Sequence, residues 1–316
     1  MPLDQSWLDL EAASGGRAIL KGSPEEIKAM VAGLVAALAP QLPKPSENVE
    51  SKDGEVDGIK YRLYWPKNAS GSLPTAIWTH GGGYMTGDLD SDDLLCRIVA
   101  EHTNSAVVNV DYRLTPEYKW PVQLDDCMKV YKWAYKNASS FHGDPNKFYT
   151  IGASAGGGLA LQIANVVLRD SELKSSLKGI CAMVPLSVHP QNVPEKYKSM
   201  YKAYSENTDT PILTAESMDI FYHHAGADPK DPGTFVGLAE DIHKQFPPTY
   251  LTSCEFDPLR DDAKIMEKAL KDAGVPVKHD YYPGFPHYFW IFPSLPESQK
   301  YVGNLLGGIE WVKGQM

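Results

Sequence analysis

Apolar residues recur along the N-terminal part of the chain at the spacing of an amphipathic helix. Pro24 suits the first helical position, Ser23 suits the N-cap, and Glu26 completes a capping box with it. The apolar positions that follow are three or four residues apart: Ile27, Met30, Val31, Leu34, Val35 and Leu38. This pattern predicts a helix over residues 24–39 that packs one apolar face on the rest of the protein.

From residue 58 onward, short apolar runs alternate with helical segments. Residues 59–65 alternate apolar and polar side chains, which predicts a strand with one solvent-facing side near a sheet edge. Further strands are predicted at 75–79, 106–110, 148–151, 180–184, 249–253 and 277–282. Helices are predicted at 93–102, 120–138, 157–169, 260–273 and 297–312. This alternation is typical of an α/β fold with a mostly parallel central sheet flanked by helices.

One segment interrupts the alternation. Residues 187–246 are rich in Tyr, Asp, Pro and Thr and separate two predicted strands. So long an excursion in an α/β fold is usually an insertion over the strand ends. We therefore expect an α/β core made of residues 56–186 and 247–316. Residues 1–55 and the insertion 187–246 are expected to form a helical cap.

The composition excludes several classes of protein. Lys and Arg total 30 against 40 Asp and Glu, which gives a formal net charge of −10. This charge repels nucleic acid and anionic membranes, so neither is expected as a partner. The four cysteines are scattered and lack the spacing of a zinc site, so we expect buried thiols and no metal.

The chain also lacks the patterns of an exported or membrane-spanning protein. The first residues have no basic segment followed by an apolar run. The longest apolar stretch, residues 29–39, is too short to cross a bilayer. We expect a soluble, cytoplasmic protein that is not integral to a membrane.

The sharpest chemical motif is a serine between glycines. Ser154 lies in Gly152-Ala-Ser-Ala-Gly156, after a predicted strand and before a predicted helix. On such a bend the hydroxyl is exposed, and the helix start turns free amides toward a developing oxyanion. The alternative is a purely structural turn, in which small residues let a helix pack on a sheet. The strand before the motif and the helix after it favour a nucleophile.

A glycine run follows the predicted strand at 75–79. His80 is followed by Gly81, Gly82 and Gly83, which let the loop turn its amides toward one point. A phosphate-binding loop is the alternative, but no G-x-G-x-x-G or G-K-[ST] follows. We expect His80 to brace this loop and not to act as a base.

These two motifs resemble the hormone-sensitive-lipase family of α/β-hydrolases, also called bacterial esterase family IV. Two further segments match it: Asp111-Tyr-Arg-Leu-Thr-Pro-Glu117, followed by Pro121 and Asp125-Asp126, and Asp257-Pro-Leu-Arg-Asp261. The resemblance runs in order from about residue 58 to the C-terminus. Among its members, the chain is similar to fungal esterases of secondary metabolism.

The resemblance implies a catalytic triad. It makes Ser154 the nucleophile, Asp257 the acid that orients the base, and His287 the general base. The order Ser, Asp, His agrees independently with that of α/β-hydrolases. Asp257 also suits a helix N-cap, and Asp261 or Asp262 could compete for the role of the acid.

The resemblance also implies an oxyanion hole made by the amides of Gly82, Gly83 and Ala155. The family usually has Asp before the nucleophile, where this chain has Ala153, so the bracing of the loop is expected to differ. Tyr84 and the aromatic insertion suggest an apolar, substrate-binding pocket of moderate size.

The expected function is hydrolysis of short-acyl esters of a small, apolar alcohol, a small-molecule substrate, with no cofactor. An amidase or formamidase would use the same triad, and the sequence does not separate the two. Hormone receptors on this fold bind a small acid without hydrolysis, but they lack a functional base. The family's tendency to dimerise makes a homodimer a further expectation.

Overall fold

The predicted strands and one strand that was not predicted join into one eight-stranded sheet in the computed structural model, which describes residues 2–316. The strand order is β1-β2-β4-β3-β5-β6-β7-β8. The two pairs β1–β2 and β2–β4 are antiparallel, and all others are parallel. The strands are β1 (Val49–Val56), β2 (Ile59–Pro66), β3 (Leu73–Thr79), β4 (Ala106–Asp111), β5 (Gly143–Ala153), β6 (Leu177–Met183), β7 (Thr249–Phe256) and β8 (Val277–Pro286). The predicted α/β class with a mostly parallel sheet is confirmed.

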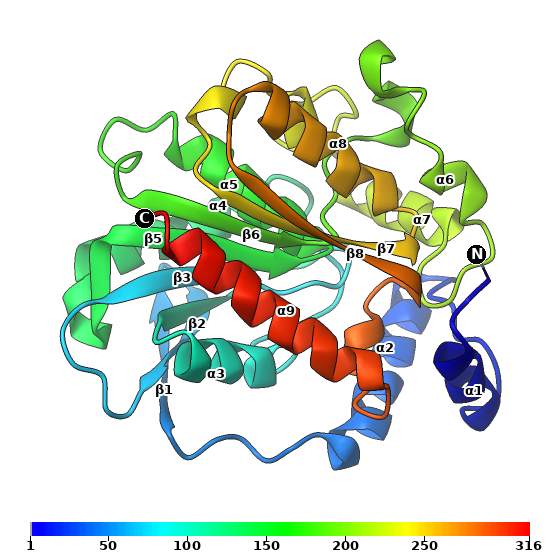
Figure 1. Cartoon of the computed structure of the whole chain (residues 1–316), viewed down its shortest axis with the longest axis horizontal. Coiled ribbons are helices and arrows are strands. Elements are labelled where there is room, and N and C mark those ends of the chain that lie inside the picture. The colour runs from blue at the N-terminus through cyan, green and yellow to red at the C-terminus, as the bar shows by residue number, and fades with distance from the viewer. Residues whose placement is uncertain (1) are drawn as a thin grey trace.

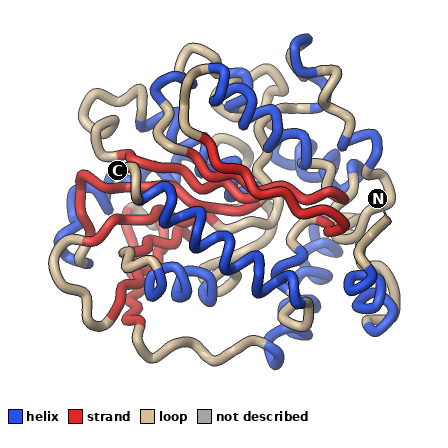
Figure 2. The backbone as a smooth tube through the Cα atoms, in the orientation of Figure 1, coloured by secondary structure: helices blue, strands red, loops and turns tan. Residues whose placement is uncertain are grey.

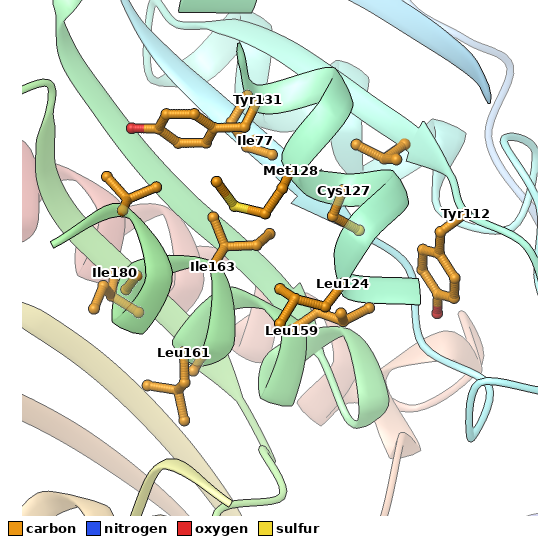
Figure 3. Close-up of a cluster of buried hydrophobic side chains, with 14 of the residues drawn as sticks. Ile77, Tyr112, Leu124, Cys127, Met128, Tyr131, Leu159, Leu161, Ile163 and Ile180 are labelled. Carbon is orange, nitrogen blue, oxygen red and sulfur yellow. The ribbon is translucent and has the colours of Figure 1, made fainter. Parts of the chain in front are cut away.

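Helices cover both faces of this sheet (Figures 1 and 2). One face carries α3 (Asp93–His102) and α9 (Pro296–Lys313), whose apolar sides pack against the sheet. The other carries α4 (Val122–Asn137), α5 (Ala155–Val167) and α8 (Arg260–Asp272). Figure 3 shows Leu124 of α4 beside Leu159 of α5, and Met128 of α4 beside Ile163 of α5, in this second core layer. Burial of these side chains drives the assembly of the layers.

Two elements depart from the expectation. Strand β1 was not predicted, because half of its sequence VESKDGEV is charged and its side chains are largely exposed at the sheet edge. It follows that β2 is the second strand of the sheet. Helix α2 (Pro24–Leu38) forms with the predicted capping box, but it buries only Ile27 and Leu38. The helix thus packs on the rest of the protein as predicted, but Met30 and Val35 are 38% and 53% exposed, so its apolar face is only partly covered.

The remaining helices gather at one end of the sheet, on the right in Figure 1. They are α1 (Gln5–Ala13) and α2 from the N-terminal segment, with α6 (Ala203–Glu206) and α7 (Ala215–Ala225) from the insertion. Backbone hydrogen bonds join the two segments: Ile212 N donates to Ala18 O at 2.7 Å, and Leu20 N donates to Ile212 O at 2.9 Å. Of the helices in residues 2–316, none combines the length and apolar character that crossing a membrane demands.

Candidate active site

Ser154 lies at a sharp bend between β5 and α5. Its backbone has φ 58° and ψ −121°, a conformation that is rare for a residue with a side chain. The flanking glycines are required by close backbone approach. A Cβ on Gly156 would clash with Thr79 O and His80 O, and one on Gly152 would clash with Thr79 O. The predicted strand–turn–helix context is therefore present, and it pushes the Ser154 side chain out of the sheet.

The structure brings Ser154, His287 and Asp257 into one hydrogen-bonded chain. His287 Nε2 lies 2.9 Å from Ser154 Oγ, and His287 Nδ1 lies 2.6 Å from Asp257 Oδ2. An ionised carboxylate only accepts, so Nδ1 carries the imidazole proton and Nε2 accepts from the serine hydroxyl. All three side chains are buried, with Asp257 at 0% exposure. This arrangement can transfer a proton from Ser154 to His287 while Asp257 stabilises the imidazolium.

The loop after β7 holds Asp257 and separates it from its two competitors. Asp257 Oδ1 accepts from the amide of Leu259 at 2.8 Å, so the carboxylate also caps the turn that leads into α8. Asp262 instead accepts from the amide of Ser187 at 2.8 Å. Asp261 accepts from the amide of Ala203 at 2.7 Å. Neither competitor contacts His287, so only Asp257 is placed to orient it.

The glycine loop lies directly over Ser154. Gly82 and Gly83 have φ 109° and 63°, which favour glycine, and within residues 2–316 their amides donate no hydrogen bond. Ala155 is the first residue of α5, where a helix leaves its amide unpaired. The side chain of Phe221, from α7, fills the space where a Gly83 Cβ would lie. Helix α7 therefore packs directly on this loop.

His80 braces the glycine loop from below. Its ring is fully buried and stacks on Tyr112 with centroids 4.1 Å apart, and Nδ1 donates to Gly81 O at 2.8 Å. Burial lowers the pKa of His80 to about 4, so it is neutral near pH 7. Tyr112 donates to His80 O at 2.7 Å, a contact the sequence analysis did not anticipate. The position of Tyr112 just after β4 was the available signal.

Tyr84 is more enclosed than a pocket residue of the expected kind. Its side chain is 5% exposed, and its hydroxyl accepts from Gln162 Nε2 at 3.2 Å. Its ring lies 5.9 Å from that of Trp120. Gln162 was missed because it lies on an otherwise apolar helix and belongs to no motif. The hydroxyl of Tyr84 is therefore engaged inside the core, and only its ring could contact a substrate.

A second Ser–His–carboxylate set lies away from the glycine loop. Ser253 Oγ is 2.8 Å from His279 Nε2, and His279 Nδ1 is 2.7 Å from Glu267 Oε2. Ser253 is fully buried within β7, and it has neither the bend nor the glycines that surround Ser154. This set joins α8 to β7 and β8. Among residues 2–316 no group of His, Cys, Asp and Glu side chains is arranged to hold a metal ion.

Comparisons with known proteins identify the family of this chain. Residues 76–291 match the family model for the alpha/beta hydrolase fold. The chain is 64% identical to the versiconal hemiacetal acetate esterase of Dothistroma septosporum, over 99% of this chain and 95% of that protein. It is 31% identical to the carboxylesterase NlhH of Mycobacterium tuberculosis, over 83% of this chain and 81% of that protein.

A solved structure supports the same grouping. The crystal structure of vibralactone cyclase superposes with a TM-score of 0.89 at 31% identity and covers 98% of this chain and 95% of that one. The matching family model and the esterase relatives share the fold of this chain over most of its length. The chain therefore belongs to the hormone-sensitive-lipase group of the α/β-hydrolase family and is a carboxylic ester hydrolase.

Proposed function

We propose that the chain hydrolyses its ester through an acyl-enzyme on Ser154. His287 removes the hydroxyl proton as Ser154 Oγ attacks the ester carbonyl, and it then donates that proton to the leaving alcohol. Water repeats the sequence and releases the acid. The observation that supports this most strongly is the continuous hydrogen-bonded chain from Ser154 through His287 to Asp257, with heavy-atom distances of 2.9 and 2.6 Å.

The amides of Gly82, Gly83 and Ala155 stabilise the oxyanion of the tetrahedral intermediate. Their support is the set of unpaired amides in the glycine loop and at the first residue of α5. Such a donor typically contributes about 10²–10³ in rate. The neutral ring of His80 holds the loop in place and does not add a positive charge near the imidazolium that forms on His287.

The proposed substrate is a short-acyl ester, such as an acetate, of an apolar aromatic alcohol. The name of the Dothistroma relative specifies an acetate as the substrate of that enzyme. The side chains around the glycine loop are aromatic: Phe221 lies on Gly83, and Tyr84 lies beside Trp120. Flat apolar walls of this kind favour an aromatic ring over a flexible lipid chain.

The cap of this esterase consists of the part of residues 1–55 that precedes β1, together with the insertion 187–246. Strand β1 itself (Val49–Val56) belongs to the sheet. The support for this cap is the backbone pairing of Ile212 with residues 18 and 20, and the packing of Phe221 on the glycine loop. The four cysteines are free and buried, which suits a reducing compartment such as the cytoplasm.

Replacement of the nucleophile tests the mechanism. Ser154→Ala should reduce the hydrolysis of p-nitrophenyl acetate to less than about one thousandth of the wild-type rate, since only uncatalysed and oxyanion-assisted attack by water remains. Ser253→Ala is the matched control, because it removes the serine of the second set and should leave kcat within twofold. More than a few per cent of wild-type activity in Ser154→Ala would refute the assignment.

A further inference from the structure

A short segment of the insertion is clamped onto the start of α8, directly after the loop that carries Asp257. Asp261 Oδ2 accepts hydrogen bonds from the amides of Lys202 and Ala203, at 2.8 and 2.7 Å. Asp261 thereby caps the first residues of α6. Because Asp261 is only four residues after Asp257, the start of α6 is fixed relative to the loop that carries Asp257.

An ion pair fixes the other end of α6. Arg260 donates from Nη2 to Glu206 Oε2 at 2.7 Å and from Nε to Asp261 Oδ1 at 2.9 Å. The Arg260 side chain is 14% exposed, so solvent screens this pair only partly. Two consecutive residues at the start of α8, just after Asp257, thus hold both ends of α6.

Asn207, directly after α6, reaches the acid itself. It is 3% exposed, and its Nδ2 donates to Asp257 O at 3.1 Å and to Ala203 O at 2.9 Å. The amide of Arg260, the first residue of α8, also donates to Asp257 O, at 3.0 Å, but it lies only three residues further along the chain. Within residues 2–316, Asn207 is therefore the contact that ties the Asp257 backbone to a different part of the chain.

We propose that Asn207 is a positioning residue that fixes the backbone of Asp257 so that its carboxylate meets His287. This inference rests on the proposed triad. Among residues 2–316, the carboxylate itself hydrogen-bonds with Leu259 N and His287 alone, so its place depends on the backbone behind it. Asn207 O also accepts from the amide of Ala215, the first residue of α7, at 3.2 Å. The cap thus acts on the reaction through the acid as well as by covering the pocket.

Substitution of Asn207 tests this role with a small reactive probe. Asn207→Ala should lower kcat for p-nitrophenyl acetate about tenfold per titrated active site, because small misplacements of catalytic groups cost 10- to 100-fold. The rate of reaction with a methyl fluorophosphonate, which is too small to reach the cap, should fall by the same factor. The inhibition constant of an aromatic alcohol should stay within twofold of wild type.

Thr208→Ala is the control, since Thr208 is exposed and adjacent to Asn207; it should match wild type in all three measurements. Glu206→Ala is a milder second variant, because it weakens the clamp from the surface and should slow phosphonate labelling two- to threefold. Wild-type labelling rates in both Asn207→Ala and Glu206→Ala would overturn the inference, as would a changed inhibition constant with an unchanged labelling rate. Failure of the wild-type protein to be labelled would instead refute the triad.

Discussion

Asp257 is the residue whose chemistry is most sensitive to a single-atom change. Its carboxylate can only accept from His287 Nδ1, so it selects the tautomer in which Nε2 is free to accept from Ser154. In Asp257→Asn an amide can present its NH₂ group to the ring and favour the other tautomer. We expect kcat to fall about 10⁴-fold with little change in KM.

Steady-state kinetics with p-nitrophenyl acetate measure this effect. Glu267→Gln is the matched control, because it makes the same carboxylate-to-amide change on the second histidine, His279. It should leave kcat within twofold. A loss below tenfold in Asp257→Asn would show that another group orients His287.

The residues that could be predicted from sequence are those whose local backbone is special. Ser154 lies on a strained bend that requires small residues on both sides, so the neighbouring Gly and Ala residues indicate its position. His287 follows a strand in a loop rich in Gly and Pro. Asn207 and Gln162 could not be predicted, because each makes a side-chain hydrogen bond to a residue 50 or more positions away in the chain. Nothing in their own neighbourhoods requires an amide.

At the scale of the element, α9 offers two glycines with opposite expectations. A Cβ on Gly303 would meet nothing within 4 Å, whereas one on Gly308 would clash with the buried ring of Tyr250. Gly303→Ala should stabilise the protein by about 0.5–1 kcal/mol, since it removes the entropic penalty of glycine in a helix. Gly308→Ala should destabilise it by about 1–3 kcal/mol through overpacking.

Chemical denaturation of the two variants measures these differences. Each serves as the control for the other, because both make the same change in one helix. A lower unfolding free energy for Gly303→Ala than for wild type would contradict the packing of α9 described above.

The contact between α8 and β8 predicts a dependence of stability on pH. A hydrogen bond from His279, with a weaker one from Lys271, lowers the pKa of Glu267 from 4.5 to about 2. The folded chain thus holds this carboxylate ionised at pH values where the unfolded chain protonates it. The resulting stabilisation is complete above about pH 4.5 and is lost as the pH falls toward 2.

Urea unfolding of wild type and Glu267→Gln over a series of pH values measures this contribution. The difference in unfolding free energy should be constant between pH 7 and 5 and should shrink from pH 4.5 downward. A difference that does not depend on pH would contradict the ion pair.

At this scale, an element could be predicted from the sequence where its side chains are buried. The strands of the sheet interior read as short apolar runs, and the parallel order follows from the helices between them. In strand β1 half of the residues are charged and most side chains face solvent, so no apolar pattern marks it. In α2 the apolar periodicity is real, but only Ile27 and Leu38 meet the core, and sequence alone does not say how much of an apolar face is covered.

At the scale of the whole molecule, the sheet supplies the rigid frame, and in our proposal the cap limits the substrate. Ser154, Asp257 and His287 all lie where parallel strands end, and Phe221 of α7 packs on the glycine loop. The formal charge of −10 does not enter the chemistry and suits solubility. In the proposed account, the aromatic side chains beside the glycine loop, Phe221 and Tyr84, limit the size of the substrate.

This arrangement predicts a preference for short acyl chains. Across a series of p-nitrophenyl esters from C2 to C12, kcat/KM should be highest at C2 to C4 and at least tenfold lower at C8 and beyond. Phe221→Ala, which opens the space over Gly83, should move the maximum to longer chains. A wild-type maximum at C8 or longer would indicate a lipase.

The most direct test of the account is to find where an organophosphate binds covalently. The wild-type protein, incubated with a fluorophosphonate and analysed by intact mass and peptide mapping, should gain one phosphonyl group per chain, on Ser154. The Ser154→Ala variant should gain none, although it keeps Ser253 beside His279. An adduct on Ser253, or labelling of Ser154→Ala at the wild-type level, would contradict the assignment of Ser154 as the nucleophile.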